Sequence, residues 1–387
     1  MRAGWAGLRG RGLPVWRRHN SVAAASLLRA GESELRQERF AEARKLFAQA
    51  VKEAKDAPDL ELEGRNRLGV ALAGLGELAA AKLEFESCVA LAGDEPARRS
   101  AALVNVAGLE LRLGSPERAV ALLREVVATR EQAAGERAPE TVDALLDLAR
   151  ALMEQGRAEE AAAQAETALA RLGEEPLADE ELQQHLRRAG LLLQVELATR
   201  LQRAVPEPAL AELLQLASDE AALRLVATYY AARRMDSETV AVLRRMQETE
   251  ETLEQLGMLH IAGGRLAEAQ GVLTRALARA EATHGKTSDK LVKPLWLLAQ
   301  SLTTDKPHDA QRVLMRILVL VKARPEGKDF QARVARQLAA VSVRQGLPNQ
   351  ALYYLRSAAT LAEASGDAAL HKAMQTDLEE YALKRKD

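Results

Sequence analysis

Apolar side chains recur along the chain at intervals of three and four residues, and short polar turns separate these runs. One run opens at Phe40-Ala41-Glu42-Ala43 and continues through Phe47 and Ala50. This spacing places apolar side chains on one face of an α-helix. The chain is therefore predicted to fold as a series of amphipathic helices.

The predicted helices form pairs that share one internal pattern. The first helix of a pair carries a small residue. The second helix carries a small residue, a bulky residue four positions later and another small residue three positions after that. The first pair has Gly31, then Ala43, Phe47 and Ala50. Comparable sets are Gly69, Ala81, Phe85, Cys88; Ala107, Ala119, Leu123, Val126; Ala149, Ala161, Ala165, Ala168; Ala227, Thr239, Leu243, Met246; Gly257, Ala269, Leu273, Ala276; Ala310, Leu314, Ile317; and Ala339, Ala351, Leu355, Ala358. Small residues let two helices cross closely while a large one fills the gap beside them, which predicts stacked helical hairpins.

The positions of these pairs predict an order of segments along the chain. Pairs start near residues 24, 62, 100 and 142, and again near 220, 250, 291 and 332. We expect about four repeats in 24–175, a degenerate repeat or hinge in 176–219, about four repeats in 220–366 and a capping helix in 367–387. Within the irregular segment, helices are expected around 179–203 and 208–216, because Pro206 and Pro208 disfavour helix just ahead of themselves.

The pattern resembles the tetratricopeptide repeat, a helix pair of about 34 residues. Several pairs here are longer, and a lengthened second helix followed by a loop containing Gly135 or Gly285 is similar to the kinesin-light-chain subtype. That subtype carries asparagine just before its small-residue pair, which Asn66 and Asn105 match and which Asp147 replaces; Gln255, Trp296 and Gln337 depart from it. The resemblance implies an all-α tetratricopeptide-repeat α-solenoid, a right-handed superhelix of helical hairpins that binds proteins or peptides.

Composition and charge agree with this prediction. Aromatic residues are 3% of the chain, and the apolar content comes mostly from alanine and leucine, which favour helices over strands. Without the five arginines that precede residue 20, 49 basic residues face 55 acidic ones, which disfavours a nucleic-acid binder. The single cysteine, Cys88, cannot form an intrachain disulfide, and no apolar run reaches the roughly 18 residues of a membrane span.

The N-terminal segment has a composition of its own. No acidic residue precedes Glu32, and five arginines alternate with apolar side chains; the arginines are Arg2, Arg9, Arg11, Arg17 and Arg18. Arginine-rich, acid-free starts are typical of mitochondrial transit peptides. We therefore expect residues 1–23 to be a transit peptide for the matrix or the matrix side of the inner membrane, with a disordered basic tail and a cytoplasmic protein as the alternative.

The first helices of the repeats are expected to line the concave face of the superhelix, where a protein or peptide would bind. The register puts nine candidate partner-binding residues there: Asn66, Asn105, Asp147, Arg150, Arg224, Trp296, Arg333, Arg336 and Arg344. The asparagines could bond a peptide backbone, or one another between helices. The arginines of residues 333–344 could attract an acidic partner or form a solvated face, and Trp296 could anchor a partner or belong to the core.

No sequence motif predicts a catalytic, metal or phosphate-binding site. The six histidines are scattered, with no pair at the spacing of a helical zinc site. Gly285-Lys286-Thr287 imitates the end of a phosphate-binding loop, but Ala280 stands where that loop needs glycine. We expect no catalytic residue, cofactor, metal or small-molecule substrate.

These observations favour a protein-interaction scaffold or adaptor. With the N-terminal segment, the chain is similar in class to mitochondrial assembly factors of respiratory complexes, and we expect an assembly or quality-control factor that holds a partner in its groove. A cytosolic cargo adaptor of the kinesin-light-chain type is the alternative. An organellar helical-repeat RNA-binding protein is a further one, but the acidic body and the apolar residues at base-reading positions disfavour it.

Overall fold

The computed structural model describes residues 22–54, 57–174, 177–216, 219–322 and 327–383. In these ranges the regular structure is helical, with nineteen α-helices and no strand. The expected transit peptide, 1–23, lies outside the described residues except for its last two positions. The chain forms two compact units, Met1–Ser218 and Asp219–Asp387.

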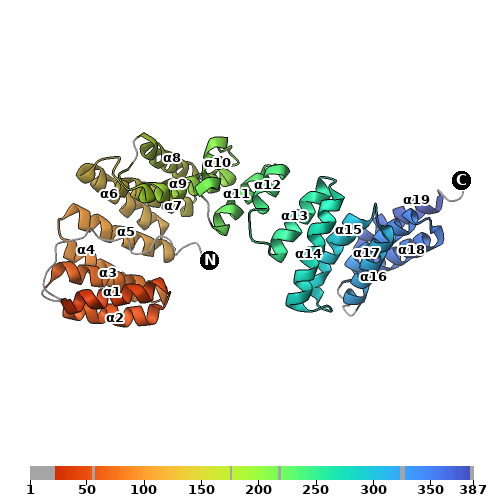
Figure 1. The fold of residues 1–387 in the computed structure, drawn as a ribbon, viewed down its shortest axis with the longest axis horizontal. Helices are drawn as coiled ribbons and strands as arrows, with labels where there is room; N and C mark the ends of the chain where they lie inside the picture. Colours follow the sequence, from red (N-terminus) through yellow and green to blue (C-terminus); the bar gives the residue numbers. More distant parts are fainter. Residues whose placement is uncertain (1–21, 55–56, 175–176, 217–218, 323–326, 384–387) are drawn as a thin grey trace. The chain divides into compact units, whose positions relative to one another are not determined.

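The first unit is a series of helical hairpins in which each helix packs against its neighbours in the chain (Figure 1). Its helices are α1 (Val22–Arg36), α2 (Phe40–Glu53), α3 (Pro58–Gly74), α4 (Leu78–Ala92), α5 (Pro96–Arg112), α6 (Pro116–Ala134), α7 (Pro139–Glu154), α8 (Ala158–Glu174), α9 (Glu180–Leu201) and α10 (Glu207–Leu216).

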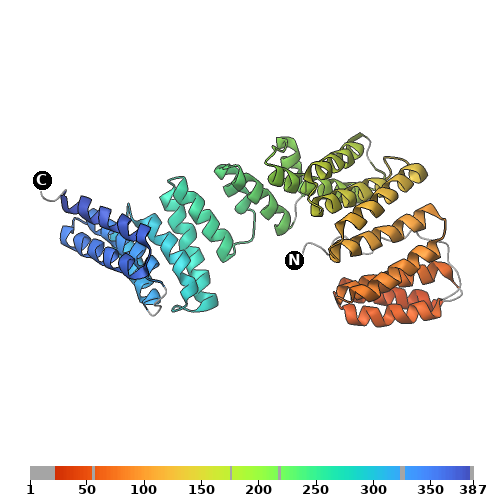
Figure 2. The ribbon, with the colours of Figure 1, turned by 180° about the vertical axis from the view of Figure 1, so that it is seen from behind.

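The second unit repeats the same arrangement and ends on a single helix that packs on the last hairpin (Figure 2). Its elements are α11 (Glu220–Ala232), α12 (Asp236–Leu243), α13 (Glu250–Ala262), α14 (Leu266–His284), the short 3-10 helix η2 (Asp289–Leu291), α15 (Val292–Leu302), α16 (Pro307–Val321), α17 (Lys328–Arg344), α18 (Pro348–Ser365) and α19 (Ala368–Leu383).

The turn between α5 and α6 shows why a hairpin forms at these residues. Gly114 has a φ of 75°, which glycine adopts without steric cost. The Ser115 N–H then donates to the carbonyl of Glu110 at 2.9 Å, which satisfies the end of α5. Pro116 follows as the first residue of α6, where its missing N–H would have had no partner. The Gly-Ser-Pro sequence therefore ends one helix and begins the next.

The two helices of a hairpin cross where a glycine of the first faces a bulky residue of the second. An added Cβ at Gly31 would lie 2.5 Å from the Phe47 ring, and one at Gly69 would lie 2.5 Å from the Phe85 ring. Gly257 meets Leu273 in the same way. Both phenylalanine rings are fully buried. The complementarity predicted between the small and the bulky positions therefore packs the two helices of each of these hairpins together.

The small residue at the start of each second helix also lies at this crossing. One set of alanines is completely buried, at 0% exposed, and comprises Ala43, Ala81, Ala161, Ala269 and Ala351. A larger side chain there would push the helices apart. The all-α fold of stacked helical hairpins that the sequence predicted is confirmed over the described residues.

The two longest second helices are those that the resemblance to the kinesin-light-chain subtype implied. Helices α6 and α14 each have 19 residues, whereas α2 has 14. The five extra residues make about one and a half turns. Each long helix ends at a glycine with positive φ, Gly135 or Gly285.

The irregular segment of the sequence contains the two helices expected there, α9 and α10. Helix α9 packs against α7 and α8, and α10 packs back on α9, so the pair continues the first unit. The compact units divide after Ser218. The finer division into five segments stays a prediction.

The second helix of the pair near residue 220 is shorter than predicted. Met246 was expected inside it, but α12 has only eight residues and ends at Leu243. The next helix begins at Glu250, where the register predicted it, and the Thr249 side chain caps this start by accepting from the Thr252 N–H at 3.1 Å. Only six residues remain between the helices, so Met246 lies in the connection.

Candidate functional site

The predicted partner-binding residues all lie on the first helices of their hairpins. In the first unit, Asn66 belongs to α3, Asn105 to α5, and Asp147 and Arg150 to α7. In the second unit, Arg224 belongs to α11 and Trp296 to α15, and α17 carries the remaining arginines, Arg333, Arg336 and Arg344. Whether a partner contacts them stays a prediction.

The two asparagines bind one another. The Asn105 side-chain amide donates to the Asn66 amide oxygen, and Asn66 is only 5% exposed. This is the bond between neighbouring helices that was the alternative to a backbone-binding role. The pair links α3 to α5 and leaves Asn105, which is half-buried, as the more accessible member.

The charged residues of α7 and α11 also have partners within the protein. Arg150 donates to Asp147 at 3.2 Å, one turn earlier on the same helix. Arg224 donates to Glu220 at 2.9 Å and to Glu251 at 3.3 Å. Its side chain is half-exposed, so these pairs are weak and open to exchange with a partner.

Trp296 is engaged by the core. Its ring packs edge-on against Phe330 of α17 at 5.4 Å between centroids, and it lies against the buried cluster of the second unit. Edge-to-face packing of this kind stabilises by about 1 kcal/mol beyond burial alone. The packing agrees with the alternative of a core residue.

The three arginines of α17 differ in their surroundings. Arg336 forms an ion pair with Asp377 of α19, with one hydrogen bond at 3.0 Å. Arg333 and Arg344 are exposed and make no ion pair or side-chain hydrogen bond with the described residues. These two cations remain free to meet an acidic group.

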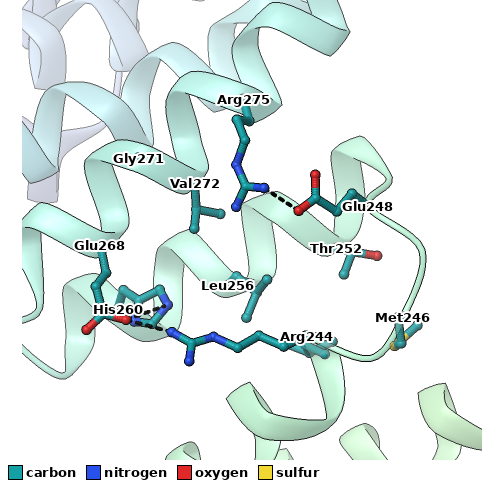
Figure 3. Close-up of a pocket in the computed structure, with 11 residues that line it drawn as sticks. Arg244, Met246, Glu248, Thr252, Leu256, His260, Glu268, Gly271, Val272 and Arg275 are labelled. Atoms are coloured by element: carbon teal, nitrogen blue, oxygen red, sulfur yellow. Dashed lines mark hydrogen bonds and ion pairs between the residues drawn. The ribbon is translucent and has the colours of Figure 1, made fainter.

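A cavity of about 310 Å³ opens beside the short helix α12 (Figure 3). It is lined by the end of α12, the connection after it, α13 and α14. Lining residues are Leu243, Arg244, Met246, Glu248, Thr252, Leu256, His260, Glu268, Gly271, Val272 and Arg275. Sequence reasoning missed this site. The signal was a spacing of 30 residues between the pair starts near 220 and 250, too short for a full second helix.

His260 is the unusual member of this cavity. Its side chain is 0% exposed, and neither ring nitrogen makes a hydrogen bond. The Glu268 carboxylate lies 3.6 Å from Nε2. Burial lowers the pKa of His260, and the guanidinium groups of Arg265 and Arg244 act in the same direction, against the opposing Glu268. The ring is therefore held neutral.

Cys88 lies in surroundings that keep its thiol protonated. Burial raises the pKa of its thiol to about 12, with Glu84 adding to the shift. Its Sγ contacts the Leu62 carbonyl oxygen at 3.6 Å. A thiol in this setting is not a nucleophile at neutral pH, because the thiolate is the reactive form.

Within the described ranges, His, Cys, Asp and Glu side chains do not gather in threes as a metal site would need. Among the same residues, no helix combines the length and apolar character required to cross a bilayer.

Comparison with protein families identifies repeats in the first unit. Residues 98–174 match a model described as tetratricopeptide repeat, and a second tetratricopeptide-repeat model matches residues 17–58 and 28–96. The chain thus carries tetratricopeptide repeats. No curated protein sequence matches it.

Solved structures with similar folds include repeat proteins of several kinds. A putative kinesin light chain of Podosopora anserina is 20% identical, with a TM-score of 0.41 over 56% of this chain and 100% of its own. A tetratricopeptide repeat protein from Parabacteroides merdae is 14% identical, with a TM-score of 0.40 over 73% and 100%. The quorum sensor NprR of B. thuringiensis is 14% identical, with a TM-score of 0.39 over 87% of each.

Proposed function

We propose that this tetratricopeptide-repeat protein is a non-catalytic scaffold that holds a partner protein against the first helices of its hairpins. The observation that carries the proposal is how the hairpins pack. Buried alanine, glycine and phenylalanine crossings take up the apolar faces, while charged residues such as Arg224 and Arg333 stay at the surface of the first helices. Surfaces of this kind in stacked repeats bind proteins and peptides.

The free arginines of α17 favour an acidic segment as the part of the partner that binds the second unit. Arg333 and Arg344 have no ion pair with a described residue, and guanidinium groups bind carboxylates with two parallel hydrogen bonds. Eleven residues separate them, which is about three helical turns. Both therefore lie on the same side of α17.

Charge reversal on α17 tests this contact. The double variant Arg333→Glu and Arg344→Glu should lose a partner that co-purifies with the wild-type chain. The exposed Lys372→Glu on α19 serves as the control, because it makes the same kind of change elsewhere in the second unit. Retention of the partner by the double variant would rule out this contact.

We further propose that the protein acts in the mitochondrion, as an assembly or quality-control factor. Support comes from the arginine-rich, acid-free residues 1–23. A cytosolic cargo adaptor and an RNA-binding protein are the alternatives.

A fluorescent fusion of residues 1–30 tests the location. We expect it to enter mitochondria, and we expect the same fusion with its five N-terminal arginines changed to glutamine to stay in the cytosol. Cytosolic fluorescence from the unaltered fusion would favour the cargo adaptor. If the whole protein bound organellar RNA and this binding weakened with salt, the RNA-binding alternative would be favoured.

A further inference from the structure

A second cavity, of about 430 Å³, opens in the first unit between the C-terminal half of α4 and the side of α5. Its floor is apolar, because Leu103 and Val106 are buried and Val89 packs against the core beside them. Two small exposed residues, Ala90 and Gly93, line it at the surface. The cavity therefore offers apolar surface to a side chain that enters from outside.

The charged groups around this cavity are not balanced. Arg99 donates to Glu125 of α6 at 3.4 Å, so its charge is compensated. Glu86 and Asp94 are exposed and make no ion pair or side-chain hydrogen bond with a described residue. In the cavity at His260, by contrast, each carboxylate of the lining already faces an arginine. Two uncompensated carboxylates beside an apolar floor suit an occupant that combines cationic and apolar side chains.

The chain itself contains a segment of that composition. Residues 1–21 carry five arginines and no acidic residue, and Trp5 lies between Arg2 and Arg9. An indole ring buries a large apolar surface, and guanidinium groups pair well with carboxylates. The segment therefore matches the cavity both in charge and in apolar character.

The order of the hairpins brings this segment within reach of the cavity. Because successive helices alternate in direction, α1, α3 and α5 all begin at the edge of the unit where α4 ends and Asp94 lies. Four helix-to-helix steps of about 10 Å separate α1 from α5, a span of at most about 40 Å. The 17 residues from Trp5 to Val22, where α1 begins, extend to about 56 Å. Trp5 can therefore reach the cavity of its own chain.

We propose that the arginine-rich residues 1–21 dock on the first unit of the same chain and place Trp5 in the cavity between α4 and α5. The indole ring packs on Leu103 and Val106, and the arginines on either side of it face the two free carboxylates. The contact belongs to the full-length chain, and removal of residues 1–23 on import would open the cavity. It goes beyond the scaffold function and depends on no partner protein.

The test replaces Trp5 with the photo-reactive amino acid p-benzoyl-L-phenylalanine in the purified full-length protein. Irradiation should join this residue to peptides from residues 86–106, identified by mass spectrometry. Irradiation of an equal mixture of unlabelled and nitrogen-15-labelled protein shows which chain is joined, and both halves of each adduct should carry the same label. Adducts elsewhere on the protein, adducts of mixed label, or no adducts would overturn the proposal.

Charge reversal tests the role of the free carboxylates. The double variant Glu86→Lys and Asp94→Lys should lower the yield of these adducts at least about fivefold, the effect of losing two surface ion pairs. The control Glu117→Lys and Glu166→Lys makes the same change of net charge at exposed positions of α6 and α8 and should keep the wild-type yield. Equal yields from the two double variants would show that a general attraction to acidic groups holds the segment, against the proposal.

Filling the cavity tests the apolar part of the contact. Ala90→Phe places a ring at the exposed side of the cavity and should also lower the yield. Ala79→Phe adds the same ring at an exposed position about 16 Å earlier on α4 and should not. Circular dichroism checks that both variants keep the helical content of the wild type. If Ala90→Phe gives the wild-type yield, residue 5 lies outside the cavity and the proposal is wrong.

Discussion

At the scale of single residues, the fold depends on the absence of side chains as much as on their presence. Gly69 has space for nothing larger than hydrogen, because the Phe85 ring occupies the volume beside it. The same residue type at Gly271 faces open space in the middle of α14. The two glycines therefore give opposite predictions for the same substitution.

Gly69→Ala should destabilise the protein, while Gly271→Ala should stabilise it. Alanine favours a helix over glycine by about 1 kcal/mol at either position. At Gly69 the new methyl group overpacks the crossing at a cost of about 1–3 kcal/mol, which offsets or exceeds that gain. Chemical denaturation of the two variants measures the difference. A stabilised Gly69→Ala protein would mean that the hairpins do not cross there.

His260 gives a second residue-scale prediction, concerning pH. Its pKa in the folded state lies below the ordinary value of 6.5, so the unfolded chain binds a proton more readily. Its contribution to stability is present above pH 6.5 and is lost as the pH falls from there towards the folded pKa. The slope contributed is up to about 1.4 kcal/mol per pH unit.

The measurement is the free energy of unfolding of the wild type and His260→Phe from pH 8 to pH 5. We expect a shallower loss of stability on acidification in the variant, because phenylalanine cannot take up the proton. Parallel curves for the two proteins would show that His260 titrates alike in the folded and unfolded states.

At the scale of elements, the final helix illustrates the difference between packing and surface charge. Helix α19 buries only one side chain, Met374, against the alanines of α17 and α18. It also carries Asp377, which forms an ion pair with the half-exposed side chain of Arg336. Most of its other residues face solvent, which suits the end of a repeat stack.

Met374→Ala should therefore cost more stability than Asp377→Asn. Removing a buried methionine side chain costs about 2 kcal/mol or more, whereas a surface ion pair contributes at most about 1 kcal/mol. Thermal unfolding of the two variants checks the order. The reverse order would indicate that α19 is held by charge and not by its apolar contact.

At the scale of the whole molecule, the repeat pattern predicted most of the fold. The fixed spacing of Ala43, Phe47 and Ala50 determined the register, because a crossing of two helices tolerates few residue types. The two helices of the irregular segment also followed from local signals, above all Pro206 and Pro208. What failed was the length of α12, because α13, capped by Thr249, begins only 30 residues after the start of α11 and leaves little room for a second helix.

The candidate sites were harder to predict than the fold. The register placed the nine partner-binding residues on the first helices, but it did not decide which neighbours they contact. The Asn66–Asn105 bond was one of two alternatives and the ion pair of Arg336 with Asp377 was not predicted, because each depends on side chains about 40 residues apart in sequence. The cavity at His260 arises where a stretch of helix is omitted, and its signal in the sequence is the spacing of 30 residues between the pair starts near 220 and 250.

The central claim is that a partner protein lies against the first helices of the hairpins. The most direct measurement introduces a photo-reactive amino acid, in the full-length chain in cells, at Arg150 of α7 and at Arg224 of α11. Parallel proteins carry it at exposed positions of second helices, Lys45 of α2 and Glu166 of α8. The account predicts protein adducts of defined mass at the first pair of positions and none at the second. Adducts confined to Lys45 and Glu166, or adducts with RNA alone, would contradict it.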